Sequence, residues 1–99
     1  MLAPDAALDL LEIWRHIRRE AGIRTADRVE ARIVEKIIYL AGNPGGGHSR
    51  KDLTDAAVRF FAVYSYLIVY RPDTRPLQVV SVLHGHRDLG TFLPRRGIS

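Results

Sequence analysis

The chain has 99 residues, of which 46% are hydrophobic and 26% charged, a composition typical of one globular domain spanning residues 1–99. It has no cysteine, no basic and apolar leader at its N-terminus, and no apolar run near the ~20 residues of a membrane span. We therefore expect no disulfides, thiolate metal sites, secretion or membrane insertion. We expect a cytoplasmic location. The net charge of +4 favours an acidic or nucleic-acid partner, although an ordinary mildly basic domain explains it equally well.

The first segment with helical periodicity runs from Pro4 to Glu20. Its apolar residues recur at helical spacing with charged residues opposite, which predicts an amphipathic helix. Pro4 suits the first helical position and Asp5 the positive end of the helix dipole, whereas Ala3 offers no side chain for capping. The apolar stripe consists of Leu10, Ile13, Trp14, Ile17 and Ala21.

A second helix is predicted from Thr25, which can cap its N-terminus, to Gly42. Gly42 and the following Asn43 and Pro44 stop it, since glycine adopts the left-handed conformation and proline cannot continue a helix. Two helices joined by a few residues around Gly22 predict an antiparallel helical hairpin.

Residues 42–55 contain four glycines and a proline and predict a long loop. The run Gly45–Gly47 does not predict a phosphate-binding loop, because it follows a helix and leads toward a strand, the reverse of the required order.

From residue 58 onward, β-branched and aromatic residues predict three strands, at 58–63, 66–71 and 77–84. The turn-forming residues between the second and third strands make them an antiparallel hairpin. The last strand is apolar on both faces, which places it inside the sheet, and the tail after Leu89 is expected to form one short turn and then fray. Helices followed by strands, without alternation, indicate the α+β class.

Three segments, in this order, resemble the ParE/RelE superfamily of toxins. Residues 3–17, Ala-Pro-Asp-Ala-Ala-Leu-Asp-Leu-Leu-Glu-Ile-Trp-Arg-His-Ile, are similar to the family's first-helix pattern. Residues 58–59 and then 66–71 are similar to its paired strands with an arginine and a Tyr-aliphatic-Tyr-Arg run. Residues 82–89 contain a segment similar to the His-Gly-x-Arg-Asp ending that is typical of ParE-like members. Together the three span nearly the whole chain.

The resemblance implies a RelE/ParE-like fold, with a helical hairpin on an antiparallel sheet. It also implies a partner, a small acidic ParD-like antitoxin that forms a hetero-oligomer with the toxin and silences it. ParE-type members inhibit DNA gyrase, whereas RelE-type members cleave messenger RNA on the ribosome. Members usually begin with a strand before the first helix, and here only Met1–Ala3 precede it. Either that strand is lost or the chosen start lies downstream of the real one, so the expected sheet has three strands, or four if these residues add one.

RNA cleavage through the 2′-hydroxyl needs a base, an acid and cations at the phosphate. His84, His86 and Arg87 lie within four residues, and Arg59 and Arg71 come from neighbouring strands, so a nuclease would draw its catalytic group from these. Alternate residues of a strand share a face, which would bring the two histidines together. The same segment can also simply end a strand. RelE-type nucleases tend to carry a tyrosine near the C-terminus, and none follows Arg87, which argues against the nuclease.

We therefore expect a ParE-like toxin that inhibits DNA gyrase by binding and performs no chemistry itself. The alternatives are a RelE-like ribosome-dependent endoribonuclease and a module that binds only the antitoxin. No cofactor is expected, and no metal, since the two histidines have no clear third ligand nearby. The arginines interleaved with acidic residues on both helices are explained by solvation, or by contact with an acidic antitoxin. The residues expected to bind the antitoxin or target are Arg59, Tyr70, Arg71, His84 and Arg87.

Overall fold

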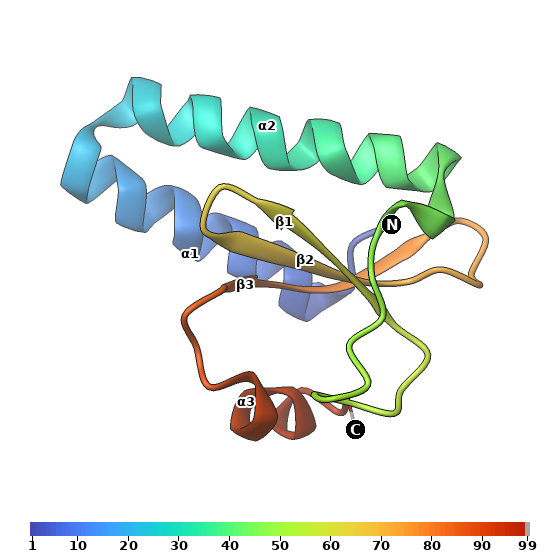
Figure 1. The fold of residues 1–99 in the computed structure, drawn as a ribbon. Helices are drawn as coiled ribbons and strands as arrows, with labels where there is room; N and C mark the ends of the chain where they lie inside the picture. The colour runs from blue at the N-terminus through green and yellow to red at the C-terminus, as the bar shows by residue number, and fades with distance from the viewer. Residues whose placement is uncertain (99) are drawn as a thin grey trace.

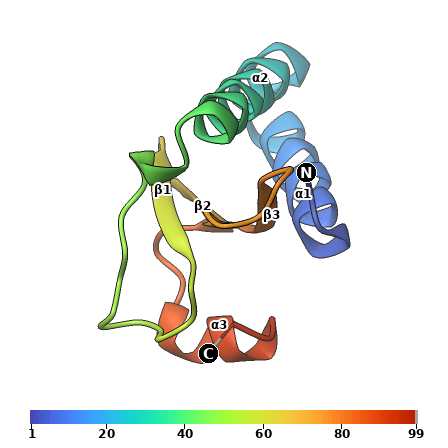
Figure 2. The ribbon, with the colours of Figure 1, turned by 90° about the vertical axis from the view of Figure 1, so that its right-hand side faces the viewer.

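The computed structural model describes residues 1–98 and confirms the predicted α+β class. Two long antiparallel helices, α1 (Pro4–Ala21) and α2 (Ile23–Gly42), lie on one face of the sheet (Figure 1). A shorter helix, α3 (Leu89–Arg95), lies on the opposite face, so the molecule has three layers (Figure 2). Within the described range, no helix is long and apolar enough to cross a membrane.

The reversal between α1 and α2 takes a single residue, Gly22. Its φ of +93° is a conformation that glycine adopts without strain. Its amide donates to the Arg18 carbonyl of α1, and its carbonyl accepts from the Ala26 amide of α2. The predicted N-cap at Thr25 is therefore wrong, because α2 begins earlier, at Ile23.

Three strands, β1 (Arg59–Val63), β2 (Tyr66–Arg71) and β3 (Gln78–His84), form an antiparallel sheet in the order β1-β2-β3. A short 3-10 turn, η1 (Pro44–Gly46), opens the loop between α2 and β1. The prediction that the last strand lies inside the sheet is wrong, since β2 is the central strand and β3 is at an edge. Both faces of β3 are buried all the same, one under the helical hairpin and the other under α3.

The outer edge of β3 is joined by the first residues of the chain. Leu2 forms a parallel bridge with Val79. The Ala3 amide donates to the Val79 carbonyl at 2.9 Å, and the Val79 amide donates to the Met1 carbonyl at 2.8 Å. The described sheet therefore has three strands, with this single bridge in place of a fourth.

Two apolar cores lie on the two faces of the sheet. On the face covered by α3, the core includes Leu89 and Leu93 of this helix and Ile98 after it, whose side chains are at most 7% exposed. The expectation that the tail after Leu89 frays is wrong, because these side chains pack on the sheet. The core under the hairpin consists of Ala6, Leu10, Ile33, Leu40, Val63, Ile68, Tyr70, Leu77, Val79 and Val82.

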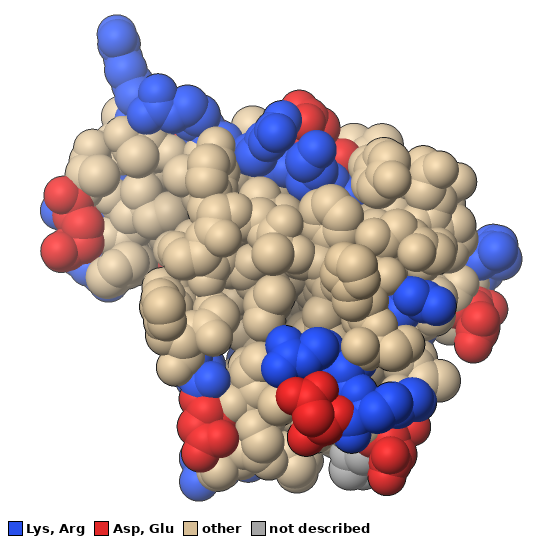
Figure 3. All heavy atoms as spheres, viewed as in Figure 1, with Lys and Arg blue, Asp and Glu red and all other residues tan. Residues whose placement is uncertain are grey.

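Charged side chains gather above α2 and at the lower end of the molecule, with uncharged surface between (Figure 3).

Candidate functional site

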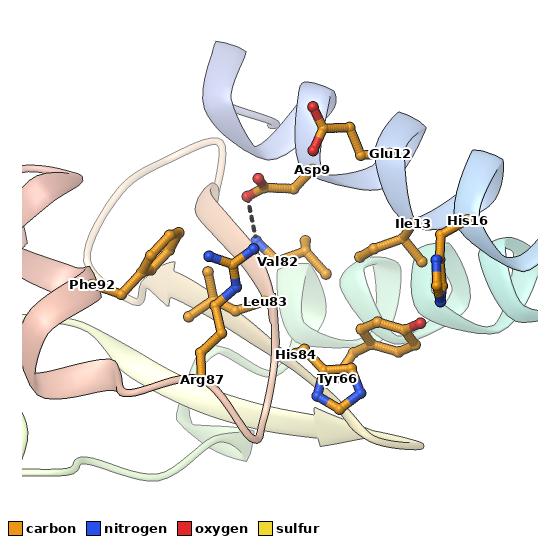
Figure 4. Close-up of a pocket in the computed structure, with 10 residues that line it drawn as sticks. All are labelled: Asp9, Glu12, Ile13, His16, Tyr66, Val82, Leu83, His84, Arg87 and Phe92. Atoms are coloured by element: carbon orange, nitrogen blue, oxygen red, sulfur yellow. Dashed lines mark hydrogen bonds between the residues drawn. The ribbon is translucent and has the colours of Figure 1, made fainter.

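A pocket of ≈ 210 Å³ opens between α1, the end of β3 and α3 (Figure 4). Apolar side chains line part of it, and carboxylates, imidazoles, a phenol and a guanidinium line the rest. An apolar hollow with a few polar groups is the usual form of a binding site. The lining residues are Asp9, Glu12, Ile13, His16, Tyr66, Val82, Leu83, His84, Arg87 and Phe92.

One wall of the pocket is fixed by an ion pair between α1 and the residue after α3. Arg96 Nη2 donates to Asp9 Oδ1 at 2.7 Å, and Arg96 Nη1 donates to Asp9 Oδ2 at 3.0 Å. The same Oδ2 accepts from the Val82 amide and from the Ser81 hydroxyl, each at 3.0 Å. The hydrogen bonding with Asp9 raises the pKa of Arg96. Because both side chains are largely buried, this network ties α1, β3 and α3 together.

Tyr66 and His84 form the opposite wall. They are register partners on β2 and β3, with ring centroids 5.4 Å apart in an edge-to-face arrangement. Burial raises the pKa of Tyr66. The ring of His86 lies 4.9 Å from that of His84, and the His86 amide donates to His84 Nδ1 at 3.3 Å. The structure brings the two histidines together, although His86 does not line this pocket.

Arg87 lies at the mouth of the pocket and is exposed. Its guanidinium carbon is 4.5 Å from the Phe92 ring centroid, and that of Arg96 is 4.9 Å from the same centroid. Among residues 1–98, Arg87 takes part in no ion pair. A guanidinium supported by an aromatic ring and free of carboxylates is available for an acidic group of a partner.

The other predicted site residues lie at the far end of the sheet. The register pairs Arg59 with Tyr70, four residues along β2 from Tyr66, which is about 13 Å of strand. Tyr70 is completely buried, and its hydroxyl donates to the Pro44 carbonyl at 2.7 Å and accepts from the Gly47 amide at 2.8 Å. This burial raises the pKa of Tyr70 and does not agree with its expected place on a binding surface.

Arg59 stabilises the same loop, since its Nη1 donates to the Gly47 carbonyl at 2.8 Å. Arg71 is half-buried at the end of β2. The structure therefore does not bring Arg59 and Arg71 to the histidines. Within the described part of the chain, no three His, Asp or Glu side chains are placed to hold a metal ion.

Comparison with known proteins identifies the family. A family model described as the ParE toxin of the type II toxin-antitoxin system parDE matches residues 1–89. The chain belongs to the ParE toxin family. Its fold is similar to that of a chain from the chromosomal ParDE TA system of P. aeruginosa, with a TM-score of 0.71 and 22% identity over 84% of this chain and 90% of that one. A search of curated proteins gives no match.

In this ParE-family chain, the match to the family model ends at residue 89, before Phe92, which lines the pocket, and before Arg96, which holds the pocket residue Asp9. Sequence reasoning missed the roles of Asp9 and Arg96. A signal for the first exists, because Asp9 lies one residue before Leu10 and borders the apolar stripe of α1. A carboxylate there needs a buried partner. Nothing local marks Arg96 as that partner among 15 lysines and arginines.

Proposed function

We propose that this ParE-family protein stops growth by binding DNA gyrase, without performing chemistry itself, and that an acidic antitoxin holds it inactive. The family match over residues 1–89 carries the proposal, because it points to the ParE branch of the superfamily. The similar solved structure belongs to a ParDE system, which supports an antitoxin as partner. The net charge of +4 supports attraction between this chain and an acidic protein.

The dimensions of the pocket support recognition of a protein surface. Its ≈ 210 Å³ is below the roughly 300–1,000 Å³ of most small-molecule sites, and suits one anchoring side chain of a partner. Arginine and aromatic side chains dominate the energy of protein interfaces, and both stand at the mouth of this pocket in Arg87 and Phe92. We therefore place the target-binding surface at this end of the sheet.

RNA cleavage at the same pocket is a second candidate, and one observation favours it. His16, Tyr66, His84 and Arg87 line a single hollow, and these are the acid, base and cation types that cleavage through the 2′-hydroxyl requires. Of the other residues that the sequence offered for catalysis, His86 does not line the pocket, and Arg59 lies at the other end of the sheet, about 13 Å of strand away.

A supercoiling assay tests the proposal. Purified protein, added to DNA gyrase with relaxed plasmid and ATP, should inhibit supercoiling or trap cleaved DNA. Prior addition of the small acidic protein encoded beside it should restore supercoiling. Unchanged supercoiling by folded protein, together with cleavage of mRNA in a translation extract that His84→Ala abolishes, would replace this proposal with the nuclease.

A further inference from the structure

The turn between β1 and β2 holds an aromatic residue in a strained conformation. Val63 and Tyr66 are register partners, so the turn itself consists of Tyr64 and Ser65. The φ of Tyr64 is +56°, and among residues 1–98 no other residue except glycine has a positive φ. The common two-residue hairpin turns need a positive φ at their first position, where glycine, asparagine or aspartate is usual. Tyrosine is unfavourable there, because its Cβ comes close to the following carbonyl oxygen.

The fold does not explain a tyrosine at this position. The side chain of Tyr64 is 62% exposed. Among residues 1–98, its ring takes part in no aromatic or cation–π pair. Tyr66, two positions later, packs against the core under the helical hairpin instead. Backbone strain that brings no packing in return is typical of residues that act in binding or catalysis.

The turn lies beside the proposed target-binding surface. The Gly85 amide donates to the Ser65 carbonyl at 2.7 Å and so joins this turn to the segment that leads from β3 to Arg87. Figure 1 shows the turn and the end of β3 at the same end of the sheet. A hollow of ≈ 300 Å³ opens here, and its lining includes Tyr64 and Tyr66. Tyr66 also lines the pocket of Figure 4, so the two hollows are neighbours.

We propose that Tyr64 is an anchoring residue of the surface that binds gyrase, and that its ring enters an apolar hollow of that protein. This inference rests on the proposed function. Tyrosine and arginine are enriched among the few residues that dominate the energy of an interface. A tyrosine has two side-chain torsions to fix, so it loses little conformational entropy on binding. The two-residue turn holds the backbone of Tyr64 in place before the partner arrives, which lowers the cost of binding further.

The chemistry around Tyr64 suits a protein better than a nucleic acid. Among the residues that line its hollow, the one permanent cation is Arg50. Arg50 donates to both carboxylate oxygens of Asp52, at 3.0 and 2.9 Å. It is therefore not free to neutralise a phosphate, which binding of a nucleic acid requires. An apolar hollow of a protein needs no such cation and covers the exposed ring.

The test uses a change with opposite effects on stability and on binding. Tyr64→Asn introduces a residue that adopts a positive φ readily, so it should raise the melting temperature by about 4 °C. The same change removes the ring, so half-inhibition of gyrase in the supercoiling assay should need roughly tenfold more protein. A residue with a purely structural role would not lose function while the fold becomes more stable.

Two control variants separate the ring from other effects. Tyr64→Phe keeps both the ring and the strain, so it should inhibit gyrase within about twofold of the wild type and melt at the same temperature. Tyr39→Asn makes the original change at a 46% exposed tyrosine near the end of α2, away from both hollows. It should inhibit gyrase as the wild type does.

The possible failures have different results. Full inhibition by Tyr64→Asn overturns the proposal and leaves gyrase as the target. Weaker inhibition with a lower melting temperature also overturns it, because Tyr64 would then be structural. In calorimetric titration with the antitoxin, Tyr64→Asn should bind as the wild type does, and a tenfold loss would assign the turn to the antitoxin instead. Wild-type protein that leaves gyrase active would reject the proposed function and this inference together.

Discussion

The two ends of the sheet carry the same kinds of side chain and use them differently. At one end, Tyr70 and Arg59 make three hydrogen bonds to backbone groups of Pro44 and Gly47, and so hold a loop. At the other end, Arg87 is exposed and has no carboxylate partner among residues 1–98. An arginine or a tyrosine in a motif therefore indicates function only when the nearby backbone has not already taken its hydrogen bonds.

The largest loss of stability is expected at Gly47, which lies in the loop that Tyr70 and Arg59 hold in place. A Cβ there would lie 2.6 Å from Tyr70 Oη and 2.8 Å from the Phe60 carbonyl oxygen. Gly47→Ala should therefore lower the free energy of unfolding in urea by about 3 kcal/mol. Gly45→Ala is the control, because nothing lies within 4 Å of its Cβ. Equal losses at the two positions would show that the loop is not anchored in this way.

At the pocket end, the next largest effect is expected from Asp9→Ala. This change leaves the Val82 amide without its acceptor and Arg96 with only the Ser81 hydroxyl, so it should cost about 2 kcal/mol in urea unfolding. Asp52→Ala, which removes an exposed ion pair with Arg50 at 2.9 Å, should leave stability unchanged. If Asp9→Ala is as mild as the control, the pair does not hold α3.

The titration of Tyr70 gives a smaller effect with a defined direction. Burial raises its pKa above the usual value of about 10, so the folded state keeps the proton at pH values where the unfolded chain loses it. Its contribution to stability is complete below pH ~10 and falls as the pH rises further. Tyr70→Phe should cost roughly 1–2 kcal/mol at pH 7 and flatten the alkaline fall in urea unfolding.

Tyr66→Phe is the comparison for this prediction, because burial also raises the pKa of Tyr66. It should flatten the alkaline fall as well, with a smaller loss at pH 7, since no hydrogen bond of the described chain involves its hydroxyl. An alkaline profile that Tyr70→Phe leaves unchanged would mean that this hydroxyl is open to solvent.

The smallest effect on stability is expected at Arg87. Because the side chain is exposed and its guanidinium lies over the Phe92 ring, Arg87→Ala should change stability by less than about 0.5 kcal/mol, while removing inhibition of gyrase in the supercoiling assay. Arg75 is an exposed arginine at the opposite end, hydrogen-bonded only within its own turn. Arg75→Ala should keep full inhibition, and the reverse result would move the target surface to that end.

Local patterns predict the helices from a clear period of apolar residues and the strands from runs of β-branched and aromatic residues. They failed for α3, a seven-residue helix containing Pro94, whose stability comes from packing on the far face of the sheet. They also misplace β3, because apolar residues on both faces of a strand usually indicate an interior strand. Here the two faces are buried by helical layers, while the strand itself stays at an edge.

The candidate site shows the same division between short-range and long-range information. His84 and His86 come together through strand alternation and a turn, which the sequence shows. The pairing of Tyr70 with Pro44 and Gly47 crosses more than 20 positions, so its structural role could not be read from a Tyr-aliphatic-Tyr-Arg run. Burial and loop contacts, which depend on the whole fold, decide which motif residues are free.

The pair between Asp9 and Arg96 also bears on the order in which the molecule folds. It joins positions 87 residues apart, and closing so long a loop costs more chain entropy than forming the local hairpins. We expect this contact to form after α1, α2 and the sheet have come together. A molecule with a complete hairpin and sheet still lacks the α3 wall of the pocket, so the proposed target surface would be complete only after that last step.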